Sequence, residues 1–191
     1  FAGLGQEIPA EWLRKLIERH FTEEEKAQIE ALGGWDKLMQ TLEERLKDRF
    51  KLEEAIVVPT PPGQALVPHV IATAAGQALA NRLRDGMSVG VGWGRTLRLS
   101  LRTVPRMSMP NLSVVSLLGG LTRSSAMNPH ETASHLADLL DAQCYLIAAP
   151  ALTDSAATRD GLMGQAMLKE VFDKGAKVDV AFLSVGELTA S

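Results

Sequence analysis

The spacing of apolar residues changes near residue 55 of this 191-residue chain. Before that point, apolar residues recur every three or four positions, which is the period of an amphipathic helix. Beyond it, short apolar runs alternate with helix-like stretches, as in βαβ units. We therefore expect a helical segment over residues 1–54, for linkage or oligomerisation, and a separate α/β domain over residues 55–191.

Three helices are expected in the first segment. One covers residues 9–20. The next starts at a capping box formed by Thr22 and Glu25 and ends before two glycines. The third begins at Asp36, a suitable N-cap residue, and runs to about residue 50. This last helix has a narrow apolar stripe that predicts packing on the rest of the chain or on a second copy. The stripe consists of Trp35, Leu38, Leu42 and Leu46.

Five apolar runs in the second region are typical of strands, at residues 55–58, 87–92, 112–118, 144–148 and 178–185. Helices are expected at 66–84, at 95–104, from Pro129 onward and at 155–174. The strands lack strict alternation of apolar and polar residues, so both sheet faces should be covered. This order predicts a mostly parallel, Rossmann-like sheet with helices on both faces. Ligands bind such sheets outside the carboxyl ends of the strands.

The segment over residues 88–97 carries the strongest chemical signal, with the sequence SVGVGWGRTL. Here an expected strand enters a glycine-rich turn and then a helix. Gly92 and Gly94 let the backbone approach a ligand closely, and the first helical N–H groups favour an anion. Arg95 adds a charged fork and Thr96 a hydroxyl, so a phosphate is the expected ligand. A tight turn without any ligand is the alternative that this segment alone leaves open.

Two common nucleotide-binding motifs do not fit the segment. The dinucleotide motif G-x-G-x-x-G requires a third glycine at position 95, where this chain has arginine, and the next strand lacks an acid for the ribose. A Walker Gly-Lys-Ser/Thr sequence is also absent. We therefore expect no cofactor.

Small residues also end the two strands that follow. Gly119 and Gly120 come directly after the run over 112–118, and Leu121 follows them. The sequence Ala-Ala-Pro-Ala closes the next run. Small residues at consecutive strand ends leave room for a ligand.

Charge is distributed unevenly along the chain, whose net charge is −3. Residues 1–54 hold 13 acidic and 9 basic residues, whereas residues 86–130 hold five arginines and no acid. A local positive field of this kind favours an anionic ligand. Arg98 and Arg102 fit a solvated helix face equally well. No aromatic residue beyond Trp93 lies among these arginines, which disfavours a nucleic-acid groove.

Other chemistry finds little support. The single cysteine, Cys144, excludes an intramolecular disulfide and a cysteine zinc site, and we expect an inert, buried thiol. His130 and His135 do not have the i, i+4 spacing of metal ligands, so we expect no metal. We assign no catalytic residue; the acids nearest to the expected strand ends are Asp154, Asp160 and Glu187. No run of about 18 apolar residues is present, so we expect no membrane span and a cytoplasmic location.

From about residue 42 to residue 191, the chain resembles the sugar-binding effector domain of SorC-type bacterial transcriptional regulators. The resemblance rests on three segments in order, VGVGWGRTL, VVSLLGGLTRSSAMNPHETASHLADLLDAQCYLIAAPAL and VDVAFLSVGEL. It implies a fold like that of phosphosugar isomerases and deaminases, without their catalysis. The family's phosphate-side loop matches Gly92, Trp93, Gly94, Arg95 and Thr96. Its second loop matches Gly119, Gly120 and Leu121.

The resemblance also implies partners. A phosphorylated sugar or a related small polyol metabolite would bind and alter operator binding by an attached helix-turn-helix. No such motif is evident in residues 1–54, and we expect the family's closing C-terminal segment to be missing. Homodimers or homotetramers are implied. Two alternatives remain: an enzyme of the phosphosugar isomerase or deaminase type on the same fold, and an oligomerisation module that uses the stripe from Trp35 to Leu46.

Overall fold

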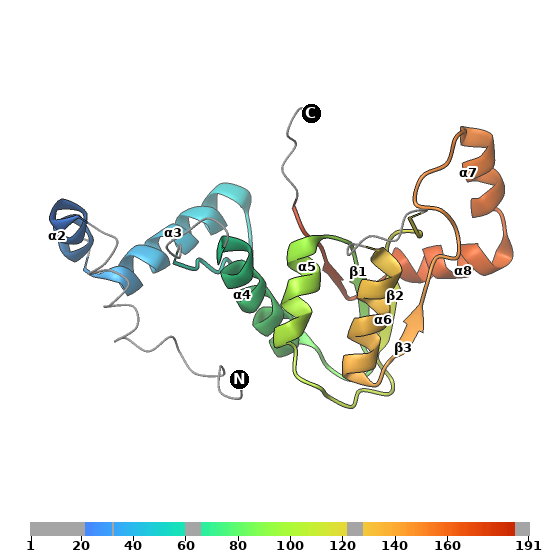
Figure 1. Cartoon of the computed structure of the whole chain (residues 1–191), viewed down its shortest axis with the longest axis horizontal. Coiled ribbons are helices and arrows are strands. Elements are labelled where there is room, and N and C mark those ends of the chain that lie inside the picture. The colour runs from blue at the N-terminus through green and yellow to red at the C-terminus, as the bar shows by residue number, and fades with distance from the viewer. Residues whose placement is uncertain (1–21, 32, 60–65, 122–127, 186–191) are drawn as a thin grey trace. The chain divides into compact units, whose positions relative to one another are not determined.

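The computed structural model describes residues 22–31, 33–59, 66–121 and 128–185 (Figure 1). The chain divides into two compact units, residues 1–70 and 71–191. This boundary lies inside a helix and differs from the functional division at residue 54, which stays a prediction. The helix expected over residues 9–20 lies outside the described residues.

The first unit contains α2 (Glu23–Ala31) and α3 (Trp35–Phe50). Gly33 and Gly34 separate them with φ angles of 92° and 91°, which glycine adopts without strain. Gly34 is the N-cap of α3, so the prediction that Asp36 caps this helix is wrong. Asp36 instead lies in the first turn, where its negative charge is favourable to the helix dipole.

The strand predicted over residues 55–58 is also absent from the described part of this unit. This stretch has no regular secondary structure, and the Val57 amide donates to the Glu43 carboxylate at 2.9 Å. An apolar run becomes a strand only when a second strand pairs with it, and the four strands that the structure describes all lie in the other unit.

The sheet of the second unit has four parallel strands in the described residues, in the order β3-β2-β1-β4. Their bounds are β1 Ser88–Val91, β2 Ser113–Ser116, β3 Gln143–Tyr145 and β4 Val180–Phe182. Val91 pairs with Ser116 on one side and with Phe182 on the other, so the strands end at one common edge. The predicted α/β class with a parallel sheet is confirmed.

Five helices accompany this sheet where the structure describes the chain. They are α4 (Val67–Arg82), α5 (Arg95–Ser100) with a following 3₁₀ turn (Leu101–Thr103), α6 (Pro129–Leu140), α7 (Ala156–Met163) and α8 (Ala166–Gly175). The single helix predicted over 155–174 is therefore wrong. Two glycines lower the helix propensity of this stretch. The first helix, α7, ends at Met163, and the second glycine, Gly164, is its C-cap. Gln165 then adopts an extended backbone conformation and is the N-cap of α8.

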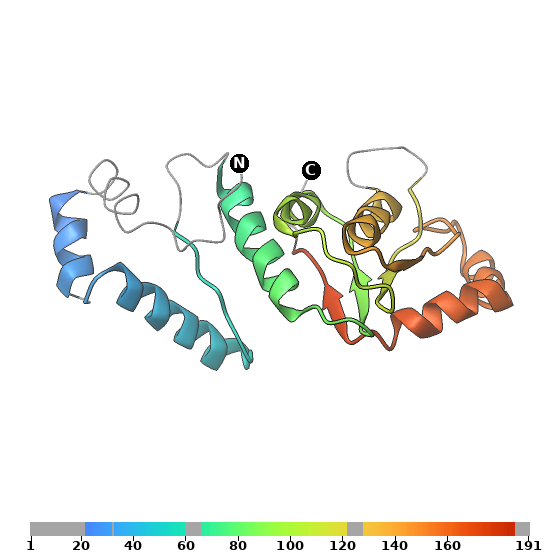
Figure 2. The same ribbon diagram turned by 90° about the horizontal axis from the view of Figure 1, so that it is seen from below.

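Helices cover both faces of the sheet, as predicted. Figure 2 shows α5 and α6 on one face and α8 on the other. The core on the first face buries thirteen residues from α4, α5, α6, β1, β2 and their connections, including Leu97, Leu136 and Leu140. On the other face, Val115 is 1% exposed and Leu168 of α8 is 6% exposed.

Cys144 is exposed, so the prediction of a buried thiol is wrong. It lies in β3, which is at an edge of the sheet as far as the structure describes the chain and there pairs with β2 alone. Partial desolvation raises the pKa of the Cys144 thiol, and the nearby Asp138 charge raises it further. The thiolate is thus disfavoured at neutral pH, in keeping with the predicted lack of reactivity.

Side-chain hydrogen bonds connect segments at the edge of the sheet where the strands begin. The Asp179 carboxylate accepts hydrogen bonds from the Ser88 amide and hydroxyl, both at 2.7 Å. The bond from the Ser88 backbone contributes most to lowering the pKa of Asp179. Asp85 similarly accepts from the amide and the side chain of Asn111. These bonds join the segment before β4 to β1, and the segment before β1 to the one before β2.

Candidate functional site

The strand order places the candidate site at the carboxyl end of β1. From β1 the chain proceeds to β2 and β3 on one side, and then returns to place β4 on the other side of β1. In open parallel sheets, ligands bind in the crevice where the strand order reverses in this way. That position lies between the carboxyl ends of β1 and β4.

The loop that follows β1, residues Gly92–Thr96, is called the β1–α5 loop below. It contains all five residues predicted for the phosphate side. Trp93 and Arg95 are exposed, whereas Thr96 is half-buried. The first turn of α5 starts at Arg95, as the sequence predicted. The Arg95 side chain forms no ion pair with any residue that the structure describes.

Contacts with the end of β4 hold this loop. The Gly92 amide donates to the Phe182 carbonyl at 2.9 Å, and the Ser184 hydroxyl donates to the Trp93 carbonyl at 2.7 Å. Gly94 has a φ of 143°, and a Cβ there would collide with the Ser184 hydroxyl. Glycine is therefore required at position 94 for both conformation and space.

The second predicted loop, Gly119–Leu121, reaches the same edge of the sheet. β2 lies beside β1, and the Leu117 amide extends their pairing by donating to the Val91 carbonyl at 2.9 Å. The structure therefore brings the two predicted loops to neighbouring strand ends. Their roles in ligand binding stay predictions.

The glycines of this second loop also have a packing role that the sequence did not reveal. The Gly120 amide donates to the Ala149 carbonyl, and the Ala151 amide donates to the Gly120 carbonyl, both at 2.9 Å. This pairing continues the β2–β3 ladder beyond the strands. A Cβ on Gly119 would collide with the Ala149 carbonyl oxygen and lie 2.8 Å from the Pro150 carbonyl carbon.

We expect Gly119→Ala to destabilise the fold by about 1–3 kcal/mol, because the atoms in the way belong to the backbone. Gly120→Ala is the matched control, since the three atoms nearest to its Cβ would all belong to the His130 side chain, the closest at 3.2 Å. Urea denaturation followed by circular dichroism measures both variants. Equal stability of the two variants would contradict the packing role of Gly119.

The amino end of α6 lies at the same edge. Asn128 caps the helix by accepting from the His130 amide at 3.1 Å, and His130 Nε2 donates to the Ile147 carbonyl at 2.9 Å. Glu131 faces Arg98 of α5, with 4.0 Å between charged atoms that are about half exposed. Exposed ion pairs of this kind contribute little stability. Arg98 is thus directed toward α6, which leaves Arg95 as the cation within the β1–α5 loop.

Two of the three acids considered for catalysis have structural explanations. Asp154, which lies just before α7, accepts a hydrogen bond at 3.0 Å from the hydroxyl of Thr158 in the first turn of that helix. Asp160 pairs with Arg159 at 2.7 Å on the exposed surface of α7. Glu187 lies outside the described residues. These contacts are typical of helix caps and surfaces, and they assign no acid–base role.

Two further classes of site were checked in the described ranges. No group of three or more His, Cys, Asp or Glu side chains is arranged to hold a metal ion in these ranges. None of the helices described is long and apolar enough to span a membrane. The absence of a metal and of a cofactor stays a prediction.

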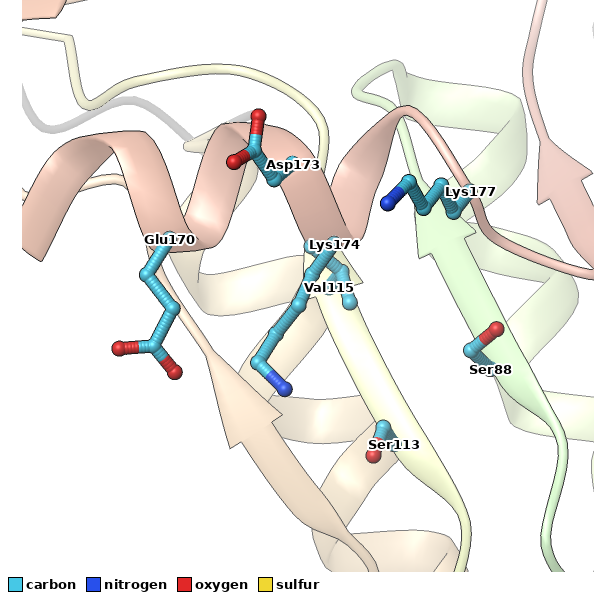
Figure 3. Close-up of a pocket in the computed structure, with 7 residues that line it drawn as sticks. All are labelled: Ser88, Ser113, Val115, Glu170, Asp173, Lys174 and Lys177. Carbon is cyan, nitrogen blue, oxygen red and sulfur yellow. The ribbon is translucent and has the colours of Figure 1, made fainter.

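A cavity of about 340 Å³ lies elsewhere in this unit, between α8 and the amino ends of β1 and β2 (Figure 3). Lys174 extends from α8 toward the sheet, with its ammonium 4.4 Å from the centre of the Tyr145 ring. The lining carries two acids and two lysines, and so has no net charge. The cavity is at the opposite edge from the β1–α5 loop.

Sequence reasoning missed Ser184. The signal for it was weak, because a single serine after the last apolar run belongs to no motif that would indicate a contact with another loop. Only the position of β4 beside β1 brings Ser184 to a loop 91 residues away in sequence.

Comparison with known proteins identifies the family of the chain. The profile of the family described as "Putative sugar-binding domain" matches residues 37–191. The chain belongs to this family. Its members form the sugar-binding domains of SorC- and DeoR-type transcriptional regulators, so the predicted resemblance is confirmed.

Among its relatives, the erythritol catabolism regulatory protein EryD of Brucella abortus is 34% identical over 155 residues, which cover 78% of this chain and 48% of that protein. The sorbitol operon regulator of Klebsiella pneumoniae is 30% identical over 152 residues, covering 76% and 47%. The full-length crystal structure of that regulator, SorC, superposes with a TM-score of 0.69 at 25% identity and covers 75% of this chain and 48% of that one. The chain thus spans about half the length of the curated relatives that it matches.

Proposed function

We propose that this chain is the part of a bacterial transcriptional regulator that binds a phosphorylated sugar or a related small polyol metabolite. The ligand would lie at the carboxyl ends of β1 and β4, against the β1–α5 loop. The observation that carries the proposal is the position of this loop: an exposed arginine and the first amides of α5 stand where the strand order reverses. Membership of the sugar-binding family supports the class of ligand.

The phosphate group is the part that the loop recognises. The amides that start α5 have no intrahelical acceptors, and Arg95 and the Thr96 hydroxyl add donors. Five arginines and no acid in residues 86–130 provide a positive local field. Gly119, Gly120 and Leu121 line the neighbouring strand end and would face the remainder of the ligand.

The regulatory output requires more than this unit. An effector shifts a conformational equilibrium only through different affinities for the two states. We propose that the ligand changes the arrangement of subunits in a homodimer or homotetramer, and thereby alters operator binding by an attached helix-turn-helix. This role implies a cytoplasmic location and no catalysis. Turnover of a bound phosphosugar would contradict the absence of catalysis.

Thermal unfolding with paired ligands tests the proposal. The names of EryD and of the sorbitol operon regulator suggest erythritol and sorbitol as parent compounds, and that of a third relative, the deoxyribonucleoside regulator of Bacillus subtilis, suggests a deoxyribonucleoside. Each is compared with its phosphate ester. A ligand at 100 times its Kd stabilises the fold by about 2.7 kcal/mol. For a chain of this size, the expected rise in Tm is roughly 5–10 °C.

We expect a rise with at least one phosphate ester and none with its parent compound. Chromatography of the same samples would detect a reaction product. A cooperative transition that no ester shifts would contradict a phosphate site in the β1–α5 loop.

A further inference from the structure

The amino end of α5 has no side-chain cap. Gly94 occupies the N-cap position of α5 and has no side chain to accept a hydrogen bond from the first turn. α5 itself has only six residues. The orientation of the peptide groups in the β1–α5 loop therefore depends on contacts from elsewhere in the fold.

The end of β4 supplies two such contacts, and they differ in kind. The bond from the Gly92 amide to the Phe182 carbonyl joins backbone atoms and does not depend on the side chain at either position. The bond from Ser184 to the Trp93 carbonyl depends on a hydroxyl. Among the described residues, Ser184 is thus the side chain that fixes the Trp93–Gly94 peptide.

Because the peptide bond is planar, the contact with Ser184 also fixes the direction of the Gly94 N–H. In a trans peptide, the carbonyl and the following N–H point in opposite directions. With the Trp93 carbonyl directed at Ser184, the Gly94 N–H points away from Ser184. Glycine at position 94 makes the reverse orientation accessible, because glycine tolerates both signs of φ. A reversed peptide would present a carbonyl oxygen where the N–H had been.

We propose that Ser184 is a positioning residue that keeps the Trp93–Gly94 peptide with its N–H, rather than its C=O, toward the phosphate. The proposal rests on the function proposed above and deepens it. Gly94 and Ser184 form a matched pair: the absence of a Cβ at position 94 provides the space that the Ser184 hydroxyl occupies. Ser184 and Trp93 are both exposed, so loss of the bond would leave the Trp93 carbonyl hydrated and the fold intact.

Binding of inorganic phosphate and of the esters above is measured by titration calorimetry for the 191-residue chain and three variants. In Ser184→Ala, we expect Kd to rise about tenfold, because only the fraction with the correct peptide orientation binds. Ser184→Thr keeps the hydroxyl and should restore the affinity. Ser155→Ala removes another exposed serine hydroxyl, the N-cap of α7, and should leave Kd unchanged.

The residual dipolar coupling of the Gly94 N–H bond reports the orientation of this bond and needs no ligand. The N–H belongs to the same peptide as the Trp93 carbonyl that accepts from Ser184, so the coupling should change in Ser184→Ala but not in Ser184→Thr. An unchanged coupling in Ser184→Ala would overturn the inference, whether or not a ligand has been found. A changed coupling with unchanged Kd would also overturn it, while leaving the proposed function intact. Failure of the unaltered chain to bind any probe would overturn the proposed function, and the positioning role with it.

Discussion

The Gly76→Ala variant is expected to be less stable than the unaltered chain by about 1–3 kcal/mol, or more. α4 passes α5 and the turn after it at Gly76, which is buried. A Cβ at this position would collide with the Ser100 carbonyl and the Thr103 hydroxyl. Thr103 cannot easily move, since its hydroxyl donates to the Ser100 carbonyl at 2.8 Å. Relief requires the two helices to separate, which would expose part of the core.

Gly161→Ala is the matched control for this prediction. Gly161 also lies inside a helix, α7, but a Cβ there would meet nothing within 4 Å. Alanine has a higher helix propensity than glycine, so this variant should be more stable by about 0.5–1 kcal/mol. Urea denaturation should therefore give opposite signs for the same substitution. A stabilised Gly76→Ala variant would contradict the close approach of α4 and α5.

The second large effect concerns the ligand. Arg95→Ala should weaken binding of the phosphate ester by about 10–150-fold, since a hydrogen bond to a charged group contributes about 1.5–3 kcal/mol. The unphosphorylated parent should bind measurably to neither the unaltered chain nor the variant, because the phosphate is the group that Arg95 is proposed to contact. Titration calorimetry of both compounds measures the difference.

Arg102→Ala serves as the control for net charge. Arg102 is exposed in the 3₁₀ turn beyond α5, and its removal changes the total charge by the same amount. At physiological ionic strength, the Debye length is about 8 Å, so distant exposed charges are largely screened. Equal losses in both variants would show that the general field, rather than Arg95, attracts the ligand.

Local pattern along the chain was sufficient to predict the elements nearest the site. An apolar run before a glycine-rich turn placed the end of β1 to within one residue and the start of α5 correctly, because both depend on neighbouring residues. Pro129 likewise marked the start of α6. The same kind of reasoning failed at residues 55–58, where the apolar run pairs with none of the strands that the structure describes, and at Gly164, where a weak helix former follows the end of α7.

Strand order could not be read from local pattern, and three conclusions depend on it. Cys144 is exposed because β3 lies at an edge. Gly119 lacks a side chain because the Ala149 backbone passes beside it. Ser184 reaches the Trp93 carbonyl because β4 returns to the other side of β1.

The amino-acid order alone was therefore enough to establish the α/β class, the parallel sheet and the residues of the β1–α5 loop, since these follow from short-range periodicity, glycine content and charge. The partners of that loop emerge only in the folded chain. Contacts between residues 91 positions apart arise from the packing of whole strands, and their side chains carry no sign of it in sequence.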